Sequence, residues 1–501
     1  MTTLPNWLHR AAANFPDKLA VRCGTTDWTF AELDQQATAL AASLAARGIR
    51  AGERVALLAS NGLPFVASVH ALTRLGGVLV PLNIRLTDDD LRWQLADVKA
   101  AHLLHEAHFA DRAANIAHLS EENTLPMHPV ILAADIQTPS IGGKKAASWD
   151  DIDLDAPQAI IYTSGTTGQP KGAIITYGMQ WWNAVGSALN LGHDPADRWL
   201  AVLPFFHIGG LSILWRSVIY GIGVVVHQRF DAASVNQSIQ EDSVTIASVV
   251  SVMVQRMLDD LGESVYPQSL RCLLLGGGPA PETLLRACAA RGIPVVQTYG
   301  MTETCSQAVT LAPVDALRKL GSAGRPLASV ELRVWNDDHE ADPDEAGEIQ
   351  LRGPTITPGY AERPDATARA WQAGWFATGD IGTLDPEGFL YVLDRRSDLI
   401  ISGGENVYPA EIEAALLAHP DVLEAGVTGV ADAQWGQAPI AFVHLREGAT
   451  ADADTLHTFL ATRLAHYKQP RTIYLTGPLP RNAAGKLLRR ELGKLVEPPP
   501  A

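Results

Sequence analysis

A chain of 501 residues is too long for one hydrophobic core, so two or three domains are expected. The formal net charge of −16 argues against a nucleic-acid partner, because phosphate backbones are met by a surplus of lysine and arginine. Hydrophobic residues make up 47% and charged residues 19% of the chain, which is typical of a soluble globular protein.

The N-terminal segment and the cysteines indicate where the protein works. Arg10 and Asp17 interrupt the region where a secretory signal would need an apolar run, and no stretch reaches the roughly 18 apolar residues of a membrane span. The four cysteines are far apart, which favours reduced thiols. We therefore expect a cytoplasmic protein without membrane insertion. The sequence leaves a homo-oligomeric state open.

Apolar runs alternate with amphipathic stretches from about residue 50 to 300. RVALLAS (54–60) predicts a buried strand, LPFVASVHALTRLG a helix and GVLVPLN (77–83) the next strand, and the same order returns twice between 199 and 300. Strand–helix–strand units of this kind form parallel sheets covered by helices. Ligands lie at the carboxyl ends of such strands.

The pattern changes after about residue 330. VELRVWND, GEIQLRG and GFLYVLD predict a small β-rich subdomain, and the helices PAEIEAALLAH and ADTLHTFLATRLAHY with three strands predict an α+β unit. The polar DRRSD at 394–398 marks the expected boundary. The predicted class is α/β, with a large N-terminal domain (1–394) of parallel-sheet subdomains plus the β-rich subdomain, and a small C-terminal domain (395–501).

The stretch YTSGTTGQPKG (162–172) is suited to phosphate. Glycines let backbone amides approach an anion, hydroxyls add donors, and a lysine adds a point charge. No hydroxyl follows the lysine, so this is not a Walker loop. The apolar strands around it predict a hairpin over a site, with a surface turn as the alternative. The candidate phosphate ligands are Thr163, Ser164, Gly165, Thr166, Thr167, Gly168 and Lys171.

A second candidate site is QTYGMTET (297–304), where a buried strand runs into polar residues. Tyr299 is suited to stacking on a nucleobase, and Glu303 to holding Mg²⁺, which usually takes one or two carboxylates plus substrate phosphates. Alternatively, Thr302 caps a helix and Glu303 complements its dipole. Upstream, residues 276–278 (GGG) form either a flat wall against a ring or a strand-end turn.

Two further candidates are weaker when taken singly. Asp380 in WFATGD follows a tight turn, where a carboxylate suits ribose hydroxyls, although aspartate is common in turns. Lys486 ends PRNAAGK behind a flexible loop, and by itself is typical of a solvated lysine.

The order of the motifs is more specific than any one of them. The hydroxyl/Gly loop, PFFHIGG, GGGP, YGMTE, TGD, DRRSD, SGGEN and a final PxxxxGK resemble, over nearly the whole chain, the adenylate-forming superfamily of acyl-CoA synthetases, luciferases and peptide-synthetase adenylation domains. The resemblance implies ATP-dependent activation of a carboxylic acid to an acyl-adenylate, release of pyrophosphate, and transfer to a thiol. No carrier domain follows residue 486, so CoA is the expected acceptor.

The resemblance also implies roles for individual residues. Residues 163–171 would hold the β- and γ-phosphates, Glu303 would bring Mg²⁺, and Lys486 would reach the α-phosphate and the attacking carboxylate. The remaining ATP contacts would come from Gly277, Gly278, Tyr299, Gly300 and Thr302 around adenine, and from Asp380 and Arg395 at the ribose. Thr302 joins Lys486 and His207 as a catalytic candidate.

A mobile C-terminal lid is a further implication of the resemblance. The lid would rotate about a hinge at Ser397. Ser402, Gly403 and Gly404 would then line a passage for the pantetheine of CoA, and His207 in PFFHIGG would gate the way between acid pocket and thiol.

The strings QTYGMTETCSQAVTL, KLGSAGRPL and YVLDRRSDLIISGGENVYPAEIE resemble the 2-succinylbenzoate–CoA ligase branch, which acts in menaquinone biosynthesis. That acid carries a second, spectator carboxylate, which needs a cation or donors when buried. Arg216, in an apolar helix, is the candidate, with an arginine directed to the surface as the alternative. Gly276, Ser306 and Gln307 would line the same pocket, the last two one helical turn beyond Thr302. Another aryl- or small-dicarboxylate-CoA ligase and a non-catalytic nucleotide-binding paralogue stay as alternatives.

Overall fold

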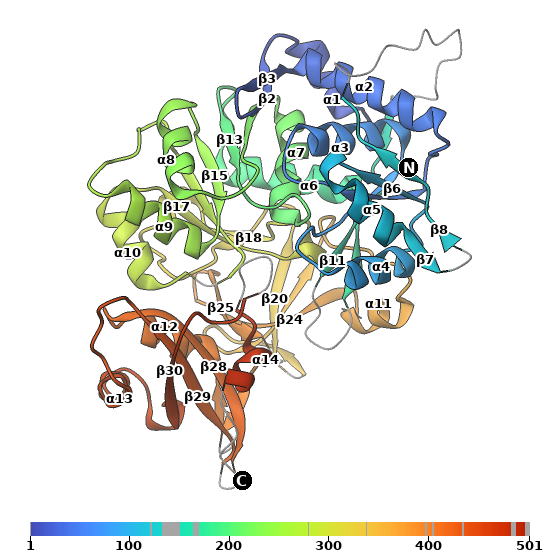
Figure 1. The fold of residues 1–501 in the computed structure, drawn as a ribbon. Helices are drawn as coiled ribbons and strands as arrows, with labels where there is room; N and C mark the ends of the chain where they lie inside the picture. Colours follow the sequence, from blue (N-terminus) through green and yellow to red (C-terminus); the bar gives the residue numbers. More distant parts are fainter. Residues whose placement is uncertain are drawn as a thin grey trace.

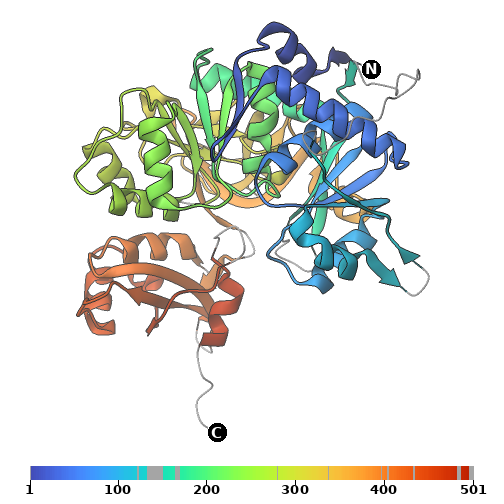
Figure 2. The same cartoon turned by 45° about the horizontal axis from the view of Figure 1, so that its top comes forward.

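The structure is a computed structural model that describes residues 2–120, 123–132, 151–163, 170–278, 280–336, 338–395, 398–402, 405–432, 435–481 and 487–495. A large body built from the N-terminal four-fifths of the chain carries a smaller C-terminal unit below it (Figures 1 and 2).

One six-stranded sheet forms a first layer of the body. Its strands, in spatial order, are β12 (Lys171–Thr176), β11 (Pro157–Thr163), β5 (Val78–Pro81), β4 (Arg54–Leu58), β6 (His102–His105) and β9 (Met127–Pro129). All neighbours pair in parallel except β11 with β12. Ala56 and Leu58 pack with α4 (Asp88–Asp97) and α5 (Ala110–Ala117), while Val55 and Leu57 face the main core. Both faces are therefore buried, as a parallel sheet requires.

A nine-stranded sheet forms the second layer. Its strands, in spatial order, are β19 (Arg325–Pro326), β18 (Val309–Thr310), β17 (Val295–Tyr299), β16 (Cys272–Leu275), β15 (Ile246–Val249), β13 (Arg198–Ala201), β14 (Gly223–Val226), β2 (Leu19–Cys23) and β3 (Thr26–Thr29). The helices α8 (Ala232–Glu241), α9 (Ser251–Leu261) and α10 (Glu282–Ala290) pack on one face.

Helices fill the space between the two sheets. They are α1 (Trp7–Asn14), α2 (Phe30–Ala46), α3 (Leu63–Leu75), α6 (Tyr177–Leu191) and α7 (Ile208–Tyr220). Residues 65–75 of α3 are all buried, including the polar residues Ser68, His70, Thr73 and Arg74, so this helix lies inside the core on every side. The main hydrophobic cluster joins these helices to strands of both sheets, so the body has one continuous interior.

The remaining sheets belong to the β-rich subdomain, to the C-terminal unit and to two short strand pairs. The β-rich subdomain contains β21 (His339–Glu340), β20 (Glu331–Asn336), β22 (Gly347–Arg352), β24 (Trp375–Leu384), β23 (Trp371–Gln372) and β25 (Leu390–Arg395), next to α11 (Pro364–Ala370). The C-terminal unit contains β27 (Glu405–Val407), β26 (Ile400–Ser402), β29 (Gly436–Leu445), β28 (Val422–Asp432) and β30 (Thr472–Thr476), with α12 (Pro409–Leu417), α13 (Ala453–Ala461) and α14 (Arg489–Leu492). Two-stranded sheets pair β1 (Thr3–Pro5) with β10 (Asp151–Asp153), and β7 (His118–Ser120) with β8 (Asn123–Thr124).

The predicted α/β class, with parallel sheets, a β-rich subdomain and a separate C-terminal unit, is confirmed. One predicted helix was too long: α13 stops at Ala461 because Thr462 caps it, and a 3₁₀ turn at His466–Lys468 follows. Among the described residues, none of the helices combines the length and the apolar character that crossing a membrane requires.

Candidate active site

The carboxyl ends of β16 and β17 bring residues 276–278 beside Tyr299. Leu275 pairs with Gln297 in parallel register, so Gly276 and Tyr299 follow neighbouring strands at one edge of the sheet. Gly277 has φ +82°, which favours glycine. A Cβ on Gly300 would lie 1.6 Å from the carbonyl oxygen of Ser306, so no other residue fits there without moving the backbone.

Tyr299, predicted to stack on the nucleobase, and Asp380, predicted to bind the ribose, are in direct contact. The Tyr299 hydroxyl donates to Oδ2 of Asp380 at 2.8 Å, and Asp380 is only 5% exposed. Asp380 on β24 lies opposite Arg395 on β25 in antiparallel register. The fold therefore gathers three of the positions that the sequence analysis assigned to adenine and ribose, although the side chain of Arg395 lies outside the described atoms.

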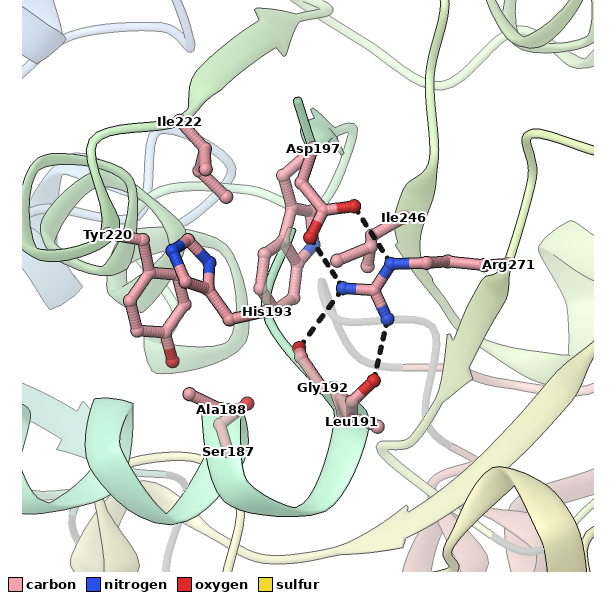
Figure 3. A pocket seen from close by; sticks show the side chains of 11 residues that line it. Ser187, Ala188, Leu191, Gly192, His193, Asp197, Tyr220, Ile222, Ile246 and Arg271 are labelled. Atoms are coloured by element: carbon pink, nitrogen blue, oxygen red, sulfur yellow. Dashed lines mark hydrogen bonds and ion pairs between the residues drawn. The ribbon is translucent and has the colours of Figure 1, made fainter. Parts of the chain in front are cut away.

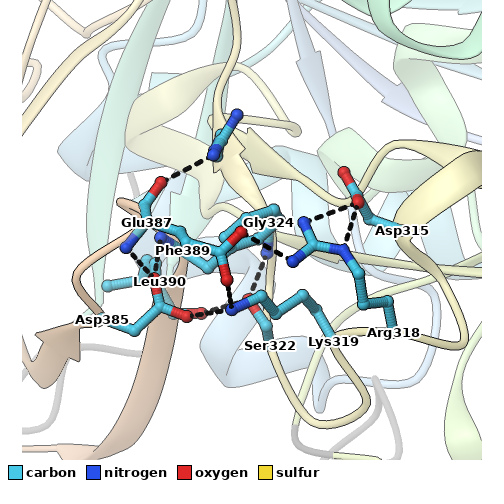
Figure 4. Close-up of polar contacts among 10 residues, drawn as sticks. Asp315, Arg318, Lys319, Ser322, Gly324, Asp385, Glu387, Phe389 and Leu390 are labelled. Atoms are coloured by element: carbon cyan, nitrogen blue, oxygen red, sulfur yellow. Dashed lines mark hydrogen bonds and ion pairs between the residues drawn. The ribbon is translucent and has the colours of Figure 1, made fainter.

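A network of charges fixes the turn between β24 and β25 (Figure 4). Lys319 Nζ lies 2.6 Å from Asp385 Oδ2 and 2.7 Å from Glu387 Oε1. Arg318 donates to Glu387 at 2.6 Å, and the Phe389 ring lies under both cations. Because the turn is clamped to the segment that follows β18, the two strands that carry the ribose candidates keep a fixed place beside β17.

The phosphate-loop prediction falls on a hairpin. Thr163 at the end of β11 lies opposite Lys171 at the start of β12, in antiparallel register, so the expected hairpin is confirmed. The residues between them, Ser164, Gly165, Thr166, Thr167 and Gly168, lie outside the described residues. Lys171 Nζ lies 5.2 Å from the centroid of the Tyr360 ring.

Glu303 lies in a 3₁₀ turn, Thr302–Thr304, directly after β17. The turn is capped by Met301, whose N–H donates to Thr304 Oγ1 at 2.9 Å, so the alternative that Thr302 caps a helix is wrong. The Glu303 carboxylate is 8% exposed, and its Oε1 accepts a hydrogen bond from the Tyr360 hydroxyl at 2.9 Å. One oriented carboxylate fits Mg²⁺, which is commonly shared between one or two carboxylates and substrate phosphates.

His207 begins α7 as its N-terminal flanking residue, and its carbonyl accepts the first helical hydrogen bond, from Leu211 at 2.9 Å. Burial lowers the pKa of the imidazole to about 4, and the nearby positive charge of Arg85 acts in the same direction. His207 is therefore neutral at physiological pH. Its buried Nε2 has no hydrogen-bond partner among the described residues, so it is available to a ligand.

A polar cluster lies inside the body where the acid pocket was predicted. Arg216 on α7 is 1% exposed, donates to Oδ1 of Asn183 on α6, and lies 5.5 Å from the ring centroid of Trp199. Asn183 in turn donates to the carbonyl of Gln307 at 2.6 Å. The alternative that Arg216 reaches the surface is wrong, because α7 is enclosed between the two sheets.

The segment after Glu303 differs from the expectation. Ser306 and Gln307 do not continue a helix: the fully buried Cys305 (φ 56°) and Ser306 (φ 91°) are left-handed, which turns the chain back toward β18. Gln307 is 1% exposed, and its Nε2 has no hydrogen-bond partner among the described residues.

Sequence reasoning missed Asn183 and Tyr360. Asn183 carried a signal, since it is a polar residue in the apolar run of α6 that a buried network would explain. Tyr360 carried none, because it meets Lys171 and Glu303 only in three dimensions.

The residues predicted for the CoA passage fall only partly within the described residues. Ser402 is buried in β26, next to β29. Gly403 and Gly404, the hinge candidate Ser397 and the catalytic candidate Lys486 lie outside the described residues, as residues 164–168 do.

A small pocket at the opposite edge of the nine-stranded sheet serves as an anchor (Figure 3). Arg271 and Asp197 form its ion pair at 2.5 Å, and Arg271 also donates to the carbonyl of Leu191 at 2.6 Å. These residues precede β13 and β16, so they lie at the amino ends of the strands. The pocket fixes the end of α6, and it shares Trp199 with the cluster around Arg216.

Comparison with known proteins gives consistent matches. The AMP-binding enzyme family matches residues 8–361, and the AMP-binding enzyme C-terminal domain matches residues 411–486. The 2-succinylbenzoate–CoA ligase of Geobacillus kaustophilus (strain HTA426) is 52% identical over 502 residues, covering 99% of both chains.

Solved structures of o-succinylbenzoate CoA synthetase (MenE) from Bacillus subtilis are similar at 44% identity. The complex with the acyl-adenylate intermediate OSB-AMP has a TM-score of 0.91 and covers 98% of both chains. The complex with ATP and magnesium ion has a TM-score of 0.89 and covers 98% of this chain and 100% of that one. A double mutant bound to the product analogue OSB-NCoA has a TM-score of 0.75, with 98% and 99% covered.

The family models span both the body and the C-terminal unit, and a relative more than half identical aligns along almost the whole length. The chain belongs to the AMP-binding enzyme family.

Proposed function

We propose that this protein is an acid–thiol ligase that uses ATP and Mg²⁺ to activate 2-succinylbenzoate and then transfers the acyl group to CoA. The full-length identity of 52% to a 2-succinylbenzoate–CoA ligase supports this substrate. In the first step a carboxylate oxygen attacks the α-phosphate, and the bond to pyrophosphate breaks. In the second step the CoA sulfur attacks the acyl carbon, the thiol proton is lost, and AMP leaves.

The first step joins two anions, so it depends on charge compensation and positioning. Asp380 and Tyr299 would fix the nucleoside, while Lys171 and the loop before it would hold the β- and γ-phosphates. Mg²⁺ at Glu303 would supply charge compensation at the phosphates. Lys486 would bring the last positive charge to the α-phosphate.

One observation favours an acid with a second carboxylate. Within the described parts of the chain, no carboxylate forms an ion pair with Arg216, although its guanidinium is buried. A buried charge without a counter-charge is costly, and burial accordingly lowers the pKa of Arg216 from its usual value. The spectator carboxylate of 2-succinylbenzoate would provide that counter-charge, with Gly276, Ser306 and Gln307 forming the surrounding pocket.

The second step would use another position of the C-terminal unit. The domains would be residues 1–394 and 395–501, with the hinge at Ser397. Two structures of the Bacillus subtilis relative support such a change. Both are 44% identical to this chain and cover nearly equal shares of it. The TM-score against this chain nevertheless falls from 0.91 for the adenylate complex to 0.75 for the product-analogue complex. Ser402, Gly403 and Gly404 would then line the CoA passage, and neutral His207 would separate it from the acid pocket.

Pyrophosphate release and CoA-thioester formation, measured across a panel of acids, test the proposal. The panel includes 2-succinylbenzoate, benzoate, malonate and medium-chain fatty acids. We expect the highest kcat/KM for 2-succinylbenzoate. Preference for another aryl or small dicarboxylic acid would reassign the substrate, and absence of pyrophosphate release with every acid would favour a non-catalytic nucleotide-binding role. A cytoplasmic location and a homo-oligomeric state stay predictions.

A further inference from the structure

Tyr360 contacts two residues of the proposed ATP site at once. Its hydroxyl donates to Glu303 Oε1 at 2.9 Å, and Lys171 Nζ lies 5.2 Å from the centroid of its ring. The carboxylate proposed for Mg²⁺ and the lysine proposed for phosphate therefore share a single aromatic side chain.

The backbone around Tyr360 holds it at this place. Tyr360 bridges to Ala173 of β12, and the flanking residues continue the pairing: Ala361 N–H donates to the carbonyl of Gly172 at 2.8 Å, and Ile174 N–H to that of Gly359 at 3.0 Å. Gly359 has φ +150°, and a Cβ there would lie 2.4 Å from the Thr367 side chain, so this backbone path needs glycine.

The same loop also fixes the Glu303 backbone. Thr357 N–H donates to the carbonyl of Glu303 at 2.7 Å, while Thr357 Oγ1 donates to the carbonyl of Ile174, also at 2.7 Å. The Tyr360 N–H donates to Thr367 Oγ1 at 2.9 Å. The loop thus ties the strand that begins with Lys171 to the turn that carries Glu303, and the ring of Tyr360 lies between the two side chains.

We propose that Tyr360 is a positioning residue for Mg·ATP, with separate tasks for its two parts. The hydroxyl orients the Glu303 carboxylate toward the metal, as the hydrogen-bond partners of metal ligands generally do. The ring face holds the Lys171 ammonium by a cation–π contact, so that it is presented to phosphate. This inference rests on the proposed ATP site but not on the identity of the acid.

Substitutions at Tyr360 separate the two tasks. Tyr360→Phe removes the hydroxyl and keeps the ring, whereas Tyr360→Leu removes both. Binding is measured with α,β-methylene-ATP, which cannot release pyrophosphate, first in EDTA and then during a Mn²⁺ titration in which free Mn²⁺ is followed by electron paramagnetic resonance. Tyr266→Phe is the matched control. It also removes a hydrogen bond of a phenol hydroxyl, which Tyr266 donates to Asn236 Oδ1 on α8 at 2.6 Å.

The expected result differs between the variants. Tyr360→Phe should weaken Mn²⁺ binding by about 10- to 100-fold and leave nucleotide binding in EDTA unchanged. Tyr360→Leu should also weaken nucleotide binding in EDTA, by roughly 2- to 30-fold. Tyr266→Phe should change neither constant.

A double-mutant cycle guards against an effect of lost stability. In a Glu303→Gln background, Tyr360→Phe should cause no further loss of Mn²⁺ affinity, because the carboxylate it orients is gone. The inference is overturned if Tyr360→Phe binds Mn²⁺ as tightly as the unsubstituted protein. It is also overturned if Tyr360→Phe causes the same loss of Mn²⁺ affinity in the Glu303→Gln background as in the original protein. Failure of 2-succinylbenzoate in the acid panel leaves these binding results intact and corrects only the proposed substrate.

Discussion

The hydroxyl of Tyr299 and the carboxylate of Asp380 meet at 2.8 Å, which joins the last residue of β17 to the middle of β24. This contact links the nine-stranded sheet to the β-rich subdomain. Because Asp380 is almost fully buried and its Oδ2 accepts from the Tyr299 hydroxyl, the carboxylate is held in one orientation.

Asp380→Asn should raise the KM for ATP by about 10- to 100-fold, since hydrogen bonds to a charged acceptor contribute about 1.5–3 kcal/mol. Tyr299→Phe should have a smaller effect, because its ring remains. Steady-state kinetics with ATP and with 2′,3′-dideoxy-ATP, which lacks both ribose hydroxyls, test whether a lost ribose contact causes the rise in KM. The difference between the original and Asp380→Asn proteins should vanish with the dideoxy nucleotide; a loss that persists there contradicts a ribose contact.

Lys486→Ala should slow adenylation by about 10²- to 10³-fold, the loss typical of one donor that stabilises developing negative charge. Thioester formation from preformed acyl-adenylate and CoA should largely survive, because a second lid position would remove the lysine from that step. Separate assays of the two half-reactions measure both rates. Lys494→Ala, which removes an exposed lysine paired with Glu491, is the control. Equal loss in both half-reactions would refute the two-position proposal.

Arg216→Met should raise the KM for 2-succinylbenzoate by about 30-fold or more, since a buried charge pair that loses one partner costs about 2–5 kcal/mol. The test compares this acid with 4-oxo-4-phenylbutanoate, which lacks the ring carboxylate. The substitution should leave the KM for the second acid and for ATP within a few-fold of the original values. A similar rise for both acids would assign Arg216 to packing of α7 rather than to the spectator carboxylate.

Buried histidines should make the protein less stable as pH falls from 7.5 to 5.5. Burial lowers the pKa of His207 to about 4 and that of His70 to about 3, against an ordinary value of 6.5. Between the lowered pKa of each folded histidine and the ordinary value of 6.5, the unfolded chain binds more protons than the folded one. The contribution of each histidine to the free energy of unfolding is therefore fully present above pH 6.5 and is lost as the pH falls below it. Each histidine should account for about 1.4 kcal/mol at pH 5.5.

Urea unfolding at a series of pH values measures this dependence. His70→Leu should reduce the slope by the share of one histidine, whatever its effect on absolute stability. A slope unchanged in that variant would show that His70 is not buried in its neutral form.

Much of the fold followed from local pattern. The runs that became β4, α3 and β5 were bounded to within a few residues, because an apolar parallel strand and an enclosed helix both have distinctive sequences. The end of α13 was misjudged, since Thr462 and the residues after it continue the apolar period while the chain has already left the helix.

The site divides in the same way. Tyr299 was singled out because it ends a buried strand, and Asp380 because a tight turn was predicted before it. In the structure Asp380 lies within β24, directly after Gly379 (φ 73°), and the fold brings the two side chains together. The course of the chain at Ser306 was not predictable, because left-handed conformations at non-glycine residues have weak sequence signals. Asn183 and Tyr360 act through partners more than 30 positions away, so no local window contains the information that assigns them.

The burial of Cys305 has a consequence for side reactions of the acyl-adenylate. An acyl-adenylate is a strong acylating agent, and a nearby thiolate would compete with CoA for the acyl group and leave the protein covalently blocked. Cys305 lies fully enclosed between Thr304 and Ser306, and burial raises its pKa to about 12, against the opposing effect of the Arg216 charge. The sulfur therefore stays protonated and poorly nucleophilic. An enzyme that makes thioesters can in this way carry a cysteine beside Arg216, the residue proposed to bind the acid, without acylating itself.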